Sequence, residues 1–159
     1  MNTAKSDLIS PCPPPGEAIL DTQAILDWLH FADPITAGWE ASRLAGDWVW
    51  VISPALRDEL CHVLQHGHLP PGCRPPQDLL ALLASRAREV GDAPCPALPM
   101  RWRCSDPDDQ KFLDLAQHRG ARWLVSRDKA VLKLRRRALL AGVHIVRPGA
   151  SWWRLGATP

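Results

Sequence analysis

The sequence predicts an α/β fold in which helices cover both faces of a mainly parallel sheet. Short apolar runs with the length of buried strands recur along the chain. Amphipathic helical segments bounded by Pro or Gly separate these runs. Two of the runs end close to an acidic residue, as expected where strand ends meet at a ligand-binding edge. Alternation of strands and helices is typical of crossover connections between parallel strands.

The length and composition suit a single globular domain. The chain has 159 residues, of which 46% are hydrophobic and 23% charged, and these values exclude wholesale disorder. No apolar run approaches the ~20 residues of a membrane span, and no secretory signal is visible. The five cysteines, an odd number without a CxxC pair, favour reduced thiols over a disulfide framework. We therefore expect a cytoplasmic protein that does not enter a membrane.

The first third of the chain predicts a tail, a strand and two helices. Residues 1–16 are rich in proline and are expected to form a flexible tail. Residues 18–20 form an apolar run that predicts a buried strand. A helix over 24–31 ends at an Asp-Pro pair, because the residue before proline disfavours the helical conformation. A second helix over 35–44 ends before a glycine.

The middle of the chain repeats this alternation. Residues 48–52 predict an apolar strand, and a Ser-Pro pair opens a helix over 55–65. A loop rich in Pro and Gly covers 67–76, and an amphipathic helix follows over 77–90. A weak strand is expected at 97–100.

The last third predicts a helix, two strands and a basic helix between them. The first helix starts at Asp106, which is expected to be its N-cap. Strands are predicted at 122–126 and 143–146, and a basic helix at 129–141. We expect one domain over 17–150 and a C-terminal tail over 151–159.

Charge is distributed unevenly along the sequence. Residues 1–117 hold 9 Lys and Arg against 16 Asp and Glu, a net of −7, whereas residues 118–159 hold 10 against 1, a net of +9. The basic side chains expected to bind nucleic-acid phosphates are Arg127, Lys129, Lys133, Arg135, Arg136 and Arg137. The alternative interpretation of such a run is a solvated helix face.

Four acidic residues are expected to converge at the carboxyl edge of the sheet. Asp21 ends the first strand and Asp128 follows the strand at 122–126, while Asp109 lies in the first turn of a helix. Glu59 lies about two turns into the helix after the second strand. Clustered carboxylates need a cation to stay ionised, and oxygen ligands suit Mg²⁺ or Mn²⁺. The chemistry that follows is metal-assisted hydrolysis of a phosphodiester. The alternative for Asp109 is a charge that only complements the dipole of its helix, and the alternative for Glu59 is a solvated position on the helix surface.

Two further groups of residues allow alternative interpretations. The residues of a candidate zinc cluster are Cys61, His62, His66, His68 and Cys73, although their spacing matches no common zinc signature. The eight tryptophans are explained mainly by core packing, but Trp28 or Trp39 lining a groove for a partner helix is the alternative. Trp152 and Trp153 are expected to pack on the sheet or to form a contact.

Four short blocks follow one another along the sequence: ILDT at 19–22, LRDEL at 56–60, DPDDQKFL at 106–113 and LVSRDK at 124–129. In this order the blocks resemble a PIN domain, in the branch that contains toxins of bacterial toxin–antitoxin pairs. The resemblance covers about residues 17–150. It implies a three-layer α/β/α sandwich with a Rossmann-like parallel sheet, and a metal-dependent ribonuclease activity.

The resemblance also implies roles for individual residues. The acidic quartet is Asp21, Glu59, Asp109 and Asp128, which are expected to be catalytic and to bind metal, with support from Thr22, Gln23 and Ser126. The family usually has Asn at the position of Gln23, so the hydrogen bond made there is expected to differ. The implied cofactor is Mg²⁺ or Mn²⁺, the substrate is RNA, and the partners are an antitoxin and a second copy of the chain. The alternatives are a nuclease that cuts DNA and a catalytically silent protein that binds nucleic acid on the same fold.

Overall fold

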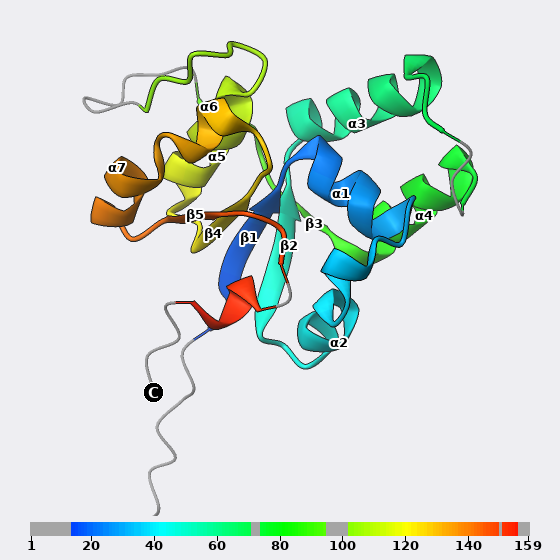
Figure 1. Cartoon of the computed structure of the whole chain (residues 1–159), viewed down its shortest axis with the longest axis horizontal. Helices are drawn as coiled ribbons and strands as arrows, with labels where there is room; N and C mark the ends of the chain where they lie inside the picture. The colour runs from blue at the N-terminus through cyan, green and yellow to red at the C-terminus, as the bar shows by residue number, and fades with distance from the viewer. Residues whose placement is uncertain (1–13, 71–73, 95–101, 150, 156–159) are drawn as a thin grey trace, which may run out of the picture.

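A single parallel sheet forms the centre of the molecule (Figure 1). The computed structural model describes residues 14–70, 74–94, 102–149 and 151–155. The strands are β1 (Gly16–Leu20), β2 (Trp48–Ile52), β3 (Arg88–Glu89), β4 (Trp123–Val125) and β5 (His144–Val146). They lie in the order β3-β2-β1-β4-β5, and every neighbouring pair is parallel. The predicted fold class, an α/β/α sandwich around a parallel sheet, is confirmed.

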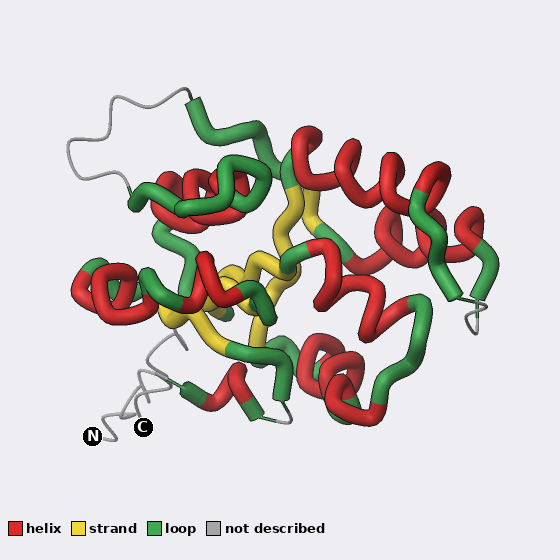
Figure 2. Tube along the Cα trace, turned by 45° about the horizontal axis from the view of Figure 1, so that its top comes forward, coloured by secondary structure: helices red, strands yellow, loops and turns green. Residues whose placement is uncertain are grey.

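Helices lie on both sides of this sheet. They are α1 (Thr22–Leu29), α2 (Trp39–Leu44), α3 (Pro54–His66), α4 (Pro76–Arg86), α5 (Gln110–Arg119), α6 (Lys129–Leu132) and α7 (Arg135–Leu140), with short 3₁₀ turns η1 (Pro34–Thr36) and η2 (Trp152–Arg154). Figures 1 and 2 show α1–α4 on one side of the sheet and α5–α7 on the other. The chain runs outward from β1 to β3, then returns to β4 and runs outward the opposite way. Because crossovers between parallel strands are right-handed, the two directions place their helices on opposite faces.

Two predicted helices are interrupted. The helix expected over 35–44 is split into η1 and α2, because Gly38 between them has a φ of +87°, a conformation that favours glycine. The basic helix expected over 129–141 is split into α6 and α7, and Leu134 at the junction has φ −86° and ψ −3°.

Two other boundaries also differ from the expectation. The helix expected over 77–90 ends at Arg86, because residues 88–89 pair instead with the edge of β2. The helix expected to begin at Asp106 begins at Gln110, and Asp106 Oδ1 accepts a hydrogen bond from the Asp108 N–H (2.9 Å) in the preceding turn. The strand expected at 97–100 and residues 1–13 of the expected tail lie outside the described residues.

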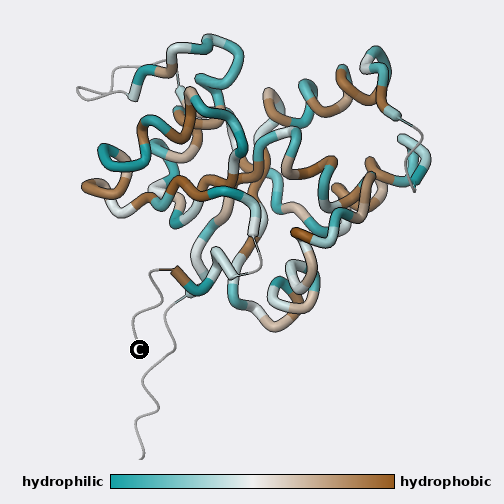
Figure 3. The backbone as a smooth tube through the Cα atoms, in the orientation of Figure 1, coloured by the Kyte–Doolittle hydropathy of each residue, from teal (hydrophilic) through white to brown (hydrophobic). Residues whose placement is uncertain are grey.

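Tryptophan side chains form much of the core on the side of α1 and α2. Trp28 and Trp39 are 7% and 0% exposed, so they belong to the core and line no groove. Trp152 in η2 packs its ring 5.0 Å from that of Trp48 and 5.5 Å from that of Trp39, measured between ring centroids. Figure 3 shows hydrophobic segments along the central strands. The residues that follow β5 therefore close one side of the core.

The helices in the described part of the chain are too short or too polar to cross a membrane.

Candidate active site

The site lies where the chain reverses its direction through the sheet. β1 and β4 are neighbours although about one hundred residues separate them, and Leu20 is in register with Val125. The ladder continues for one step, since the Asp21 N–H donates to the Val125 carbonyl (3.0 Å). Helices leave these two strands on opposite faces, so a crevice opens beyond their carboxyl ends. This is the place where open parallel sheets bind ligands.

Asp21 is held rigidly at the end of β1. Its Oδ1 atom accepts from the Ala24 N–H (2.7 Å), which makes Asp21 the N-cap of α1, and its Oδ2 atom accepts from the Arg127 N–H (3.3 Å). The side chain is only 7% exposed. Burial raises the pKa of Asp21, while the Ser126 hydroxyl and these two N–H groups partly offset the rise.

Asp128 is held at the corresponding position after β4. It is the N-cap of α6, where its Oδ1 atom accepts from the N–H groups of Ala130 (2.5 Å) and Val131 (3.3 Å). The Asp128 N–H donates to Ser126 Oγ (3.0 Å), and Ser126 is fully buried. The Ser126 hydroxyl also lowers the pKa of Asp21, so this one buried side chain lies near both strand-end acids.

Glu59 reaches the same place from α3. Its Oε1 atom accepts from the Thr22 hydroxyl (2.7 Å), and its Oε2 atom forms an ion pair with Lys111 Nζ. Lys111 also donates to the Asp108 carbonyl (2.6 Å). Sequence analysis did not identify Lys111, although its place two residues after Asp109, in the first turn of α5, is a sign of its proximity. This lysine neutralises one of the four acids.

The pKa of Asp109 is raised by its burial and by the nearby carboxylates. Asp109 precedes α5, and its side chain makes no capping hydrogen bond. Desolvation, followed by repulsion from nearby carboxylates, raises its pKa to about 6. The repelling acids are Asp128, Asp106, Asp21 and Glu59.

The four predicted acids line one pocket of about 400 Å³. Its complete lining is Asp21, Thr22, Gln23, Leu26, Glu59, Val63, Asp109, Phe112, Arg127 and Asp128. The structure therefore brings together residues from α1, α3, the turn before α5 and the turn after β4. Ser126 lies beneath the pocket as a buried link and does not line it.

A comparison with models of protein families identifies the family of the chain. The model of the PIN domain family matches residues 17–130, which is more than two thirds of the chain. The chain belongs to the PIN domain family. Proteins of this family are generally nucleases that need metal ions. No curated protein matches the sequence.

The pocket of this PIN domain fits a hard divalent cation by the chemistry of its donors. All four acids supply oxygen, and the raised pKa of Asp109 indicates negative charge that no positive side chain fully balances. Within the described ranges no three His, Cys, Asp or Glu side chains stand in a ligand arrangement. The same holds for the candidate zinc residues in those ranges, where the rings of His62 and His66 stack with centroids 4.6 Å apart, and Cys73 lies outside them.

Gln23 and Arg127 form a network beside the pocket. Gln23 Nε2 donates to Asp27 Oδ1 (2.9 Å), one helical turn along α1, and makes no bond to Asp21. The buried Asp27 pairs through Oδ2 with Arg127 Nε (2.8 Å), and Arg127 also lies 3.4 Å from Asp33 Oδ2. The guanidinium expected to bind phosphate is thus already paired with two acids. Asp27 was not identified from the sequence, since its position on α1 gave no sign of this contact.

The remaining predicted cations are exposed. Lys129, Lys133, Arg135 and Arg136 line a second hollow beside the acidic pocket, whereas Arg137 is exposed on α7 and does not line it.

Replacement of Asp109 by Asn should stabilise this PIN domain at neutral pH when divalent cations are removed. The folded pKa lies above the unfolded value of 3.8, so the folded state loses stability as the pH rises from about 4 to about 6. Screening at this half-buried position leaves an expected gain of about 1 kcal/mol at pH 7.5, which should halve by about pH 5. Urea unfolding in chelator at both pH values measures the gain. A less stable Asn variant at pH 7.5 would mean that the ionised carboxylate is favourably solvated.

Proposed function

We propose that this PIN domain is a metal-dependent endoribonuclease that hydrolyses phosphodiester bonds in RNA. The observation that carries the proposal is the convergence of Asp21, Glu59, Asp109 and Asp128 on one pocket at the switch point of the sheet. Packing of the fold alone does not require four carboxylates from four separate segments at one place. A bound cation would offset the repulsion between these four carboxylates.

Asp21 and Asp128 would be the primary ligands of Mg²⁺ or Mn²⁺, with Asp109 and Glu59 completing the site directly or through water. When bound, the ion would lower the pKa of a water molecule and shield the charge of the phosphate. The chain contributes orientation: two N–H groups hold the Asp21 carboxylate, and the buried Ser126 hydroxyl accepts from the Asp128 N–H. Thr22 holds Glu59 toward the same pocket.

The finer assignment depends on the resemblance described above. Four sequence blocks resemble toxins of bacterial toxin–antitoxin pairs, so we propose that this chain is such a toxin, with an antitoxin as its partner and with a second copy in a homodimer. The basic residues after Asp128 support a nucleic-acid substrate.

A paired cleavage assay tests the enzymatic proposal. The purified protein is incubated with single-stranded RNA and with DNA of the same sequence, in Mn²⁺, in Mg²⁺ or in chelator. We expect cleavage of the RNA in either metal and none in chelator. Cleavage of the DNA alone would assign a DNA-directed nuclease. A folded protein that cuts neither strand and binds no Mn²⁺ in calorimetry would be the catalytically silent binding protein.

The toxin proposal has a separate test. Induced expression in a bacterial host should arrest growth, and expression of the Asp21→Asn variant should not. Growth unaffected by a protein that cuts RNA in vitro would contradict the toxin role and leave the nuclease activity in place.

A further inference from the structure

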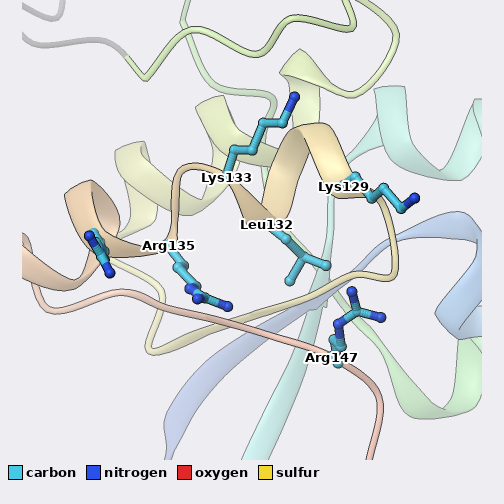
Figure 4. Close-up of a pocket in the computed structure, with 6 residues that line it drawn as sticks. Lys129, Leu132, Lys133, Arg135 and Arg147 are labelled. Carbon is cyan, nitrogen blue, oxygen red and sulfur yellow. The ribbon is translucent and has the colours of Figure 1, made fainter.

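A second hollow of about 440 Å³ lies over α6, the start of α7 and the residue after β5 (Figure 4). We call it the cation pocket, and its lining is Lys129, Leu132, Lys133, Arg135, Arg136 and Arg147. Five of these six side chains are positive, and no acid lines the pocket in the part of the chain that the structure describes. Such a surface favours an anionic ligand.

The five positive side chains of the cation pocket have no acidic partner among the residues that the structure describes. Other arginines of the chain do have acidic partners, such as Arg43 with Glu40 (2.8 Å) and Arg57 with Glu89 (2.9 Å). Among the described residues no Asp or Glu lies within ion-pair distance of any of the five. Like charges gathered without counter-charges repel one another, and an anion bound among them would relieve this repulsion.

The cation pocket is lined by side chains from α6, from α7 and from the residue after β5. Figure 4 shows Arg135, from the first turn of α7, and Arg147, from the end of β5, on either side of Leu132. Arg147 follows a parallel strand, so it lies at the same edge of the sheet as the acidic pocket. Leu132 is 9% exposed and offers an apolar surface between the two guanidinium groups.

A third hollow joins the cation pocket to the acidic pocket. It is lined in part by Arg127 and Asp128, which also line the acidic pocket, and by Lys129 and Lys133, which also line the cation pocket. A continuous path therefore runs along α6 from the four acids to the five cations. An extended strand with one phosphate at the acids has an open course to the cation pocket.

We propose that the cation pocket binds internal backbone phosphates of the RNA strand on one side of the cleaved bond. The inference rests on the proposed nuclease function, since it assumes that the cleaved bond lies at the acidic pocket. Arg135 and Arg147 hold the phosphates as fork-shaped donors, and Leu132 contacts the sugar between them. Internal phosphates are favoured over a terminal phosphate because the path is open along its length rather than closed into a cap.

Binding of RNA by matched double variants tests this proposal. All proteins carry Asp21→Asn and are kept in chelator, so that binding is measured without cleavage. The probe is a single-stranded RNA of about 16 nucleotides that has a fluorescent label and no 5′ or 3′ terminal phosphate. Its binding is followed by fluorescence anisotropy. The pocket variant is Arg135→Gln with Arg147→Gln. The control is Arg119→Gln with Arg154→Gln, which removes the same charge from exposed arginines outside the cation pocket.

We expect the pocket variant to bind at least about tenfold more weakly than the parent, and the control less than about threefold more weakly. The slope of log affinity against log salt should fall by about 1.4 in the pocket variant, since each lost phosphate contact accounts for ~0.7. If both double variants weakened RNA binding equally, the RNA would be attracted by the overall positive charge and not by the cation pocket. This result would overturn the proposal. An effect confined to RNA with a 5′ or 3′ phosphate would overturn it in favour of a terminal-phosphate site.

RNA cleavage is then measured with the same double variants in a protein that keeps Asp21. This measurement separates the inference about the cation pocket from the proposed nuclease function. Normal RNA cleavage and binding by the pocket variant would refute the cation pocket and leave the nuclease standing. A parent protein that never cuts RNA, yet binds it through Arg135 and Arg147, would support the cation pocket and refute the nuclease.

Discussion

Asp21→Asn should lower the rate of RNA cleavage by at least about 10³-fold, equivalent to about 4 kcal/mol of transition-state stabilisation. The substitution removes one negative oxygen from the most buried of the four acids. The fold should survive, because an Asn side-chain carbonyl still accepts the Ala24 N–H that caps α1. Removing a buried charge whose pKa is raised should also leave the thermal stability at pH 7.5 equal to or above that of the parent.

The measurement is single-turnover cleavage of a labelled RNA in Mn²⁺, with a melting curve for each protein. Asp58→Asn is the matched control, because Asp58 adjoins Glu59 but has a side chain that is 72% exposed and does not line the pocket. The control should cut within about twofold of the parent, as expected for a solvated surface charge. A rate for Asp21→Asn within tenfold of the parent would show that cleavage does not depend on this carboxylate.

Trp152→Ala should lower the free energy of unfolding by about 3–5 kcal/mol. Trp152 is 3% exposed, and its ring packs against those of Trp39, Trp48, Trp123 and Trp153 at centroid distances of 5.0–5.7 Å. These contacts tie the turn after β5 to α2, β2 and β4. Truncation would remove the ring and leave a cavity among rigid neighbours that relax little.

Urea unfolding followed by circular dichroism measures this loss. Leu155→Ala is the control, since Leu155 is 49% exposed and its contact with Trp123 Nε1 uses the backbone carbonyl (3.1 Å), which the substitution keeps. It should change the free energy of unfolding by less than about 1 kcal/mol. A loss below 1 kcal/mol for Trp152→Ala would mean that the folded core does not depend on the chain after β5.

The fold class and the acidic cluster were predictable because their evidence is local. An apolar run of strand length followed by an acid, as at Leu20 and Asp21, reports both a buried strand and the edge at which it ends. The carboxyl ends of parallel strands share one edge, so Asp128 after β4 had to lie near Asp21 once the two strands became neighbours. The strand at 88–89 was missed because its exposed residues carry no apolar pattern and are extended only through pairing with β2.

By itself, the sequence determined the parallel α/β architecture and the convergence of four acids at one edge of the sheet. Only the tertiary structure decided which cations are free to meet a substrate. Arg127 is paired with Asp27, one hundred residues earlier, whereas Arg147, which no sequence pattern distinguished, lines the cation pocket without an acidic partner among the described residues. Hydrophobic periodicity is a property of neighbouring residues, but an ion pair depends on distances of a few ångströms between segments that are brought together by folding.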